Sequence, residues 1–182
     1  METPEDCVVF LCPGRYAEIS LMSHEITNCP KRGRGRTFER VFKNTGRGKI
    51  FEYALQDQGA TLNPAKFNVK DPNTYAWDVL FKGQKTEIKS FNFIGTDARW
   101  WSWHDKYAPN AFLNNLDIID ALLIGDYVQN TSCPHTYHVK WLLMTKIDTE
   151  WKTRYVRRSG HNPNKMYYHH KSDPNHVNLL RA

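Results

Sequence analysis

Hydrophobic and polar residues alternate between Trp77 and Ser90, and this alternation predicts a hairpin of two short strands. A two-residue loop at Gly83-Gln84 would join them, because glycine in the first central position suits a type II′ turn. The residues opposite one another in this register are Lys82 with Lys85, Leu80 with Glu87, and Asp78 with Lys89. Since side chains alternate between the faces of a strand, Asp78, Glu87 and Lys89 are expected on one face.

An apolar stripe at helical spacing precedes the hairpin and predicts a helix from Thr45 to Gly59. Thr45 suits the N-cap, and Gly59 suits the position just after the helix. The stripe consists of Ile50, Phe51, Ala54 and Leu55. Glu52 lies at the edge of this stripe, where it can face a site at the end of the sheet.

The same region permits a second interpretation, in which Thr37–Phe42 and Lys49–Leu55 form a hairpin around residues 44–48. In that case Glu18, on a possible helix from Tyr16 to His24, would replace Glu52 as an additional carboxylate. The sequence leaves both interpretations open.

Apolar segments after the hairpin predict the remaining elements. The nearly continuous apolar segment Ile118–Val128 is typical of a central strand that is buried on both faces. Further predicted elements are a short helix at Pro109–Leu116 and strands at Tyr137–Lys146 and Met166–His169. The chain of 182 residues is long enough for one domain, 1–182, with a loop-rich C-terminal segment at 159–182.

Two carboxylates and an ammonium group on one face of a hairpin form a site for a hard cation beside an amine. The pattern of Asp78, eight further residues and then Glu87-Ile88-Lys89 resembles the core motif of the PD-(D/E)XK nuclease superfamily. The residue before Asp78 is Trp77, where the motif has proline. The resemblance covers the chain from about Thr45 to Val128.

The resemblance implies an α/β restriction-endonuclease-like fold, in which helices flank a mixed sheet with an α-β-β-β-α-β core. It implies that Asp78 and Glu87 bind Mg²⁺, that Mn²⁺ can substitute, and that the Ile88 carbonyl adds a ligand. Lys89 would orient or deprotonate the attacking water. Glu52 matches a helix residue that many members add to the metal site.

The expected activity is therefore that of a metal-dependent DNA endonuclease, of the restriction type or of the structure-specific type found in phages and junction resolvases. A homodimer is expected, because cutting two strands requires two sites.

Positive charge is concentrated before the hairpin. The chain has 25 Lys and Arg residues against 19 Asp and Glu, and Glu39 is the only acidic residue between positions 31 and 49. The segment 31–36 is predicted to be a mobile basic loop, and such a region favours contact with DNA phosphates. The expected DNA-contacting residues are Arg32, Arg34, Arg36, Arg40, Lys43, Arg47, Lys49 and, after the motif, His104.

Two other functions compete with the nuclease hypothesis. In a non-catalytic nucleic-acid-binding module, the hairpin would carry only an ordinary cross-strand ion pair. In an HNH-type nuclease, histidines between His161 and His176 would serve the site, but Pro163 and Pro174 disfavour the helix that this motif needs. The sequence has no apolar stretch of transmembrane length and no signal peptide, so an intracellular protein of a bacterial cell or a phage-infected host is expected.

Overall fold

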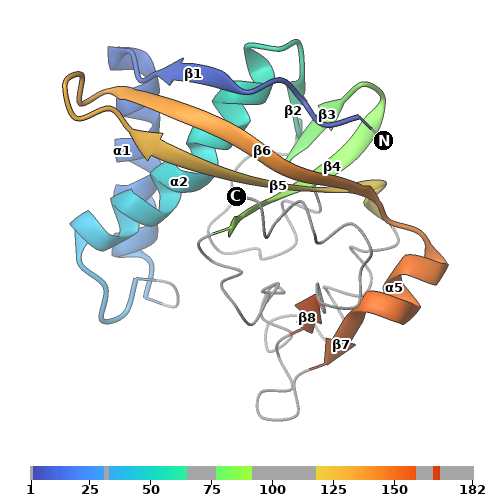
Figure 1. Ribbon diagram of the computed structural model, residues 1–182. Coiled ribbons are helices and arrows are strands. Elements are labelled where there is room, and N and C mark those ends of the chain that lie inside the picture. Colours follow the sequence, from blue (N-terminus) through green and yellow to red (C-terminus); the bar gives the residue numbers. More distant parts are fainter. Residues whose placement is uncertain (1, 31–32, 65–76, 92–117, 159–165, 169–182) are drawn as a thin grey trace.

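The computed structural model describes residues 2–30, 33–64, 77–91, 118–158 and 166–168. Within these ranges the protein is mixed α/β, with a six-stranded sheet and three helices (Figure 1). The strands of the sheet are β1 (Cys7–Phe10), β2 (Thr61–Leu62), β3 (Val79–Phe81), β4 (Gln84–Ser90), β5 (Ala121–Gln129) and β6 (Thr136–Lys146). The helices are α1 (Pro13–Asn28), α2 (Phe38–Gln56) and α5 (Thr149–Tyr155), and a separate small sheet pairs β7 (Val156–Arg158) with β8 (Met166–Tyr168).

The sheet has the strand order β1-β6-β5-β4-β3-β2. Its neighbouring strands are antiparallel except β4 and β5, which run parallel from Thr86 opposite Ala121 to Ser90 opposite Gly125. The first five residues of β5 are all buried, which confirms the predicted central strand. A parallel pair needs a crossover connection. The intervening residues 92–117, with the predicted helix Pro109–Leu116, lie outside the described residues.

The hairpin between β3 and β4 turns one residue earlier than the sequence predicted. Its central residues are Lys82 (φ 47°) and Gly83 (φ 77°), and positive φ at both positions is the property of a type I′ turn, which matches strand twist. Leu80 consequently lies opposite Lys85 instead of Glu87. This register differs from the predicted one by two residues, and an even shift leaves each side chain on its expected face.

Helix α2 is longer than the sequence predicted: it begins at Phe38, whereas the predicted helix began after Thr45. The Thr37 hydroxyl accepts a hydrogen bond from the Arg40 N–H at 3.3 Å and caps the helix. The alternative hairpin is wrong, because both of its predicted strands lie within α2 apart from the Thr37 cap. Gly59 (φ 90°) follows the end of the helix as predicted, and the N–H of Ala60 donates to the Leu55 carbonyl.

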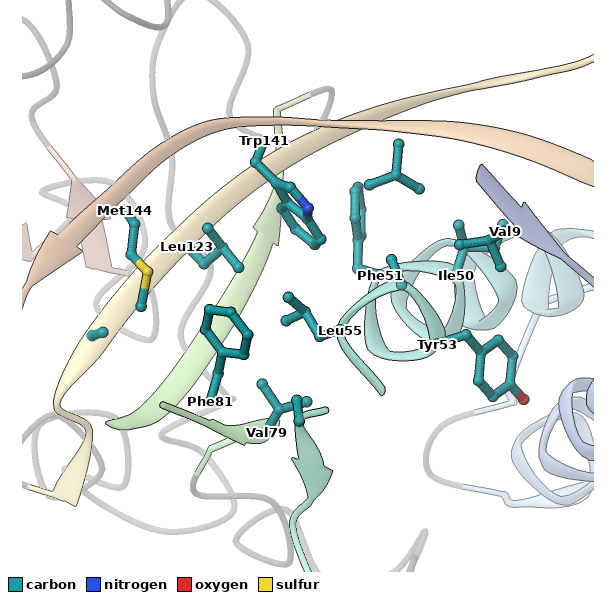
Figure 2. Close-up of a cluster of buried hydrophobic side chains, with 14 of the residues drawn as sticks. Val9, Ile50, Phe51, Tyr53, Leu55, Val79, Phe81, Leu123, Trp141 and Met144 are labelled. Carbon is teal, nitrogen blue, oxygen red and sulfur yellow. The ribbon is translucent and has the colours of Figure 1, made fainter. Parts of the chain in front are cut away.

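The main core lies between α2 and one face of the sheet. Figure 2 shows Phe51 and Leu55 of α2 directed at Leu123 and Trp141 of the sheet. A Cβ at Gly125 would lie 2.8 Å from both the Phe51 and Trp141 rings, so glycine allows this close packing. Side chains on the other face form a second cluster, which consists of Ile119, Leu122, Ile124, Leu142, Leu143, Ile147 and Trp151.

The predicted basic loop is in part a packed turn. Residues 31–32 lie outside the described residues, but the Gly33 N–H donates to the Cys29 carbonyl at 2.7 Å and the Arg36 N–H to the Gly33 carbonyl at 2.9 Å. A Cβ at Gly33 would lie only 2.0 Å from the Thr27 carbonyl oxygen. Glycine at this position thus permits close packing against the end of α1, which corrects the expectation that the whole segment 31–36 is a mobile loop.

The C-terminal segment 159–182 lies outside the described residues apart from β8, which confirms the predicted strand. In the part of the chain that the structure describes, no helix combines the length and apolar character needed to cross a membrane.

Candidate active site

Strand β4 supplies the Glu87 and Lys89 side chains. They lie two positions apart and therefore on the same face of the strand, as the sequence predicted. Lys89 Nζ lies 2.5 Å from Glu87 Oε1 and forms an ion pair with it. Glu87 is only 3% exposed. Burial penalises charge, so a charged pair in this position requires interactions with its surroundings that offset the loss of hydration.

Asp78 directly precedes β3 and is bound to β4 by two hydrogen bonds. Its N–H donates to the Thr86 carbonyl at 3.0 Å, and its Oδ2 accepts from the Ile88 N–H at 2.7 Å. The Ile88 amide lies between Glu87 and Lys89 in the chain, so this contact holds the Asp78 carboxylate beside both. The structure thus brings together the two carboxylates and the lysine of the predicted motif.

The two N-terminal helices supply a second group of charged residues. Lys49 Nζ lies 2.6 Å from Glu52 Oε2 and 3.3 Å from Glu18 Oε1, which comes from α1. The Tyr53 hydroxyl donates a short hydrogen bond to the other carboxylate oxygen of Glu18. Lys49 itself is 6% exposed. Both carboxylates that the sequence offered as alternatives, Glu52 and Glu18, therefore belong to one network.

Asp78 connects the helix group with the strand group electrostatically. Burial raises the pKa of Asp78, while Lys89, the Ile88 N–H and Lys49 oppose the increase. Burial raises the pKa of Glu52 to about 7; Lys49 lowers it in part, and Asp78 raises it further. Burial likewise raises the pKa of Glu87 to about 8, with repulsion from Asp78 adding to the effect.

The two lysines keep their charge in this environment. Burial alone would lower the pKa of Lys89, but Glu87 and Asp78 outweigh burial and raise it. Glu52 and Glu18 do the same for the pKa of Lys49. The described cluster has four carboxyl groups and two lysines, so without further positive charge Glu52 and Glu87 favour their protonated, neutral forms.

A divalent cation fits this shortage of positive charge. Glu87 Oε2 is buried and has no hydrogen-bond partner among the described residues, and an unpartnered buried oxygen of this kind is a ready metal ligand. No group of three acidic, histidine or cysteine side chains converges on one point in the described part of the chain. One oxygen of Glu52 and one of Glu87 instead contact Lys49 and Lys89.

The residues that were expected to contact DNA differ in their exposure to solvent. Arg34, Arg36, Arg40 and Lys43 are exposed, and Arg47 is partly buried. Lys49 lies inside the carboxylate cluster, so it does not have the exposure that phosphate contact requires. Arg32, His104 and the C-terminal histidines of the HNH alternative lie outside the described residues.

The contacts of Lys49 and Tyr53 with acidic side chains were not anticipated from the sequence. A signal was present, since Lys49 and Glu52 are three positions apart on a helix and can form an ion pair. The contact with Glu18 requires α1 to pack against α2, and helix spacing alone does not specify that packing.

The sequence model of the bacteriophage T4 endonuclease IV family matches residues 22–168. This span covers most of the chain and includes Glu52, Asp78, Glu87 and Lys89. A mixed α/β protein with a buried cluster of carboxylates and lysines is thereby placed among nucleases. The chain belongs to the bacteriophage T4 endonuclease IV family. The comparisons with curated proteins and with solved structures each gave no match.

The raised carboxyl pKa values predict how stability depends on pH. Glu52 and Glu87 have pKa values of about 7 and about 8 in the folded protein, above the ordinary value of 4.5. Between about pH 5 and 8 the folded chain therefore binds more protons than the unfolded chain, and the free energy of unfolding should fall as pH rises. In EDTA we expect a decrease of up to roughly 6 kcal/mol over this range, measured by urea denaturation.

Glu87→Gln should flatten this dependence, because glutamine does not titrate. Glu39→Gln is the matched control on exposed helix surface and should leave the slope unchanged. A wild-type protein whose stability is constant or increases over this range would contradict the assignment of raised pKa values to the cluster.

Proposed function

We propose that this chain is a Mg²⁺-dependent DNA endonuclease with a site of the PD-(D/E)XK type, and that Mn²⁺ can substitute for Mg²⁺. The observation that carries the proposal is the hydrogen bond that joins Asp78 to the backbone between Glu87 and Lys89, in a chain of an endonuclease family. The three side chains of the motif thereby meet in one buried place.

The order of the elements supports a restriction-endonuclease-like core. Helix α2 is followed by the three strands β2, β3 and β4, and then by β5 parallel to β4. The order of these five elements is compatible with the α-β-β-β-α-β arrangement. The second helix of that arrangement would fall within residues 92–117.

The carboxylates are the proposed metal ligands. Asp78 and Glu87 would hold the ion, the Ile88 carbonyl would add an oxygen, and Glu52 would contribute from the side of α2. Their oxygens are the ligand type that Mg²⁺ prefers. When bound, Mg²⁺ lowers the pKa of a coordinated water and stabilises negative charge on a phosphate.

Lys89 is the proposed partner of the attacking water. Its side chain is 20% exposed, and the ion pair with Glu87 holds its ammonium group in place. A positioned ammonium group can orient a water by hydrogen bonding and can stabilise charge that develops on the phosphate.

The exposed basic residues at the start of α2 are the proposed DNA contacts. Arg34, Arg36, Arg40 and Lys43 lie on the turn and helix that lead toward Lys49 and Glu52. We extend the proposal to a homodimer for substrates in which both strands are cut. Incubation with supercoiled plasmid, linear duplex, single strand and a four-way junction, in Mg²⁺ or EDTA, tests the activity and separates a nuclease from a metal-independent binding module.

Asp78→Ala and Glu87→Ala should each abolish metal-dependent cleavage, because each removes a ligand of the ion. DNA binding should persist or increase, since a negative charge near the phosphates is removed. Cleavage is measured on the preferred substrate and binding by fluorescence anisotropy. Glu150→Ala, on exposed α5, is the control and should cut as wild type does. Cleavage near the wild-type rate in either site variant would exclude that residue.

Lys89→Ala should lower the cleavage rate by at least about 100-fold, because water positioning by a general acid or base contributes that much. The variant should still bind metal, since the carboxylates remain. The two effects are separated by measuring single-turnover cleavage and Mn²⁺ binding by calorimetry. Loss of Mn²⁺ binding together with activity would instead assign Lys89 to holding the carboxylates in place.

Replacing Arg34, Arg36 and Arg40 together by glutamine should weaken binding to all DNA sequences. For every phosphate that the variant no longer neutralises, the log–log salt slope should fall by about 0.9 on duplex DNA. The measurement is anisotropy at several salt concentrations with two unrelated sequences. A control with Lys82, Lys140 and Lys146 changed to glutamine removes equal charge from exposed positions of the β3–β4 turn and of β6. Equal slopes in the two triple variants would mean that net charge, and not this surface, governs binding.

A further inference from the structure

Strand β1 forms one edge of the six-stranded sheet, and in the described part of the chain it pairs with β6 alone (Figure 1). The Leu11 N–H, directly after the strand, donates to the His135 carbonyl at 2.8 Å, so the odd-numbered residues direct their backbone groups at β6. These groups alternate in direction along a strand, and those of Val8 and Phe10 therefore face away from the sheet. The Phe10 carbonyl accepts a contact from Arg15 Nη1 at 3.4 Å and has capacity for a second hydrogen bond.

The side chains beside this edge are apolar and exposed. Val9 is buried against α2, whereas Val8 is 55% exposed and Phe10 is 54% exposed on the opposite face of the sheet. The strand Cys7–Phe10 contains no charged residue and no proline, which are features that commonly prevent an edge strand from pairing with another chain. The edge is therefore open to a further strand.

A second copy of β1 fits this edge, because antiparallel pairing about a two-fold axis is self-complementary. With the axis at Val9, Val8 of each copy lies opposite the partner subunit's Phe10. Both of these pairs would exchange N–H and carbonyl hydrogen bonds across the interface. The exposed apolar side chains of both copies would then form one cross-strand cluster.

The charges that flank β1 agree with the antiparallel arrangement. In the same register, Glu5 lies opposite the partner subunit's Pro13, the first residue of α1. This helix begins at Cys12 without a side-chain cap, and its first turn contains no acidic residue. A helix N-terminus has partial positive charge, and Glu5 is exposed. Each subunit would thus place an acidic side chain at the positive end of the partner's α1.

We propose that the β1 edge is the homodimer interface of this protein and that two copies join their sheets there. The inference deepens the proposed function and rests on it for its use, because cutting two strands requires two sites. Strands β6 and β5 separate β1 from β4, which supplies Glu87 and Lys89, so the interface leaves the site of each subunit free. The paired strand is short, and the dimer is therefore expected in a concentration-dependent equilibrium with the monomer.

The test is the association state of the full chain, measured by sedimentation equilibrium over a range of protein concentrations. Wild-type protein should dimerise reversibly. The double change Val8→Lys and Phe10→Lys places like charges opposite each other and should raise the Kd of the dimer by at least about 100-fold. The matched control is Leu21→Lys with Val128→Lys, which changes two exposed apolar residues outside β1 and should dimerise as wild type does.

Mixing separates a lost interface from a damaged strand. The double change Val8→Glu and Phe10→Glu should also give a monomer, and mixing it with the lysine variant should restore dimers, because each ammonium group then faces a carboxylate. Circular dichroism establishes that both variants are folded. Monomeric wild-type protein, equal dissociation of the control, or folded variants that fail to associate on mixing would overturn the interface.

Metal-dependent cleavage, measured in parallel on supercoiled plasmid, distinguishes this inference from the proposed function. A monomeric wild-type protein that cuts in Mg²⁺ would overturn the β1 interface and leave the nuclease site intact. Conversely, a wild-type dimer that dissociates in the lysine variant but does not cut would overturn the proposed function and leave the interface.

Discussion

The hydrogen bond from the Ile88 N–H to the Asp78 carboxylate is the interaction on which the site depends. Asp78 lies outside the regular part of β3, so strand pairing alone does not fix its side chain. The bond of 2.7 Å fixes it against β4. Asp78 is also the residue through which the helix carboxylate Glu52 interacts with the strand group. Without this bond, the helix and strand groups would be two separate ion pairs.

Concentrating these charges opposes folding. Each buried carboxylate loses hydration, and its ammonium partner compensates for only part of that loss. The raised pKa values of Glu52 and Glu87 are the direct expression of this imbalance. The surrounding apolar packing must supply the stability, and α2 shows how: Phe51 and Leu55 pack into the sheet, whereas Lys49 and Glu52, on the same helix, belong to the cluster. One helix therefore contributes both the stabilising core and the destabilising site.

The sequence was most informative where a pattern repeats over several residues. The apolar segment of β5 and the alternation of Glu87 and Lys89 identified the central strand and the shared face. It was less informative where tertiary packing overrides local preference. Gly46 and Gly48 weaken a helix by about 1 kcal/mol each, and they concealed the continuity of α2 back to Thr37. Burial of Val41 and Ile50 outweighs that penalty. Likewise, nothing in the spacing of Lys49 indicates burial, because its partner Glu18 lies on another helix.

The turn at Lys82-Gly83 has a consequence for how this family can vary. Neither residue belongs to the charged cluster. The turn nevertheless sets the register of β3 and β4, and the register decides which of their side chains share a face of the sheet. A change of one residue in its length would reverse that relation, so that Asp78 and Glu87 would point away from each other while both strands still formed. A related chain that keeps this active site therefore needs a turn whose length differs from this one by an even number of residues.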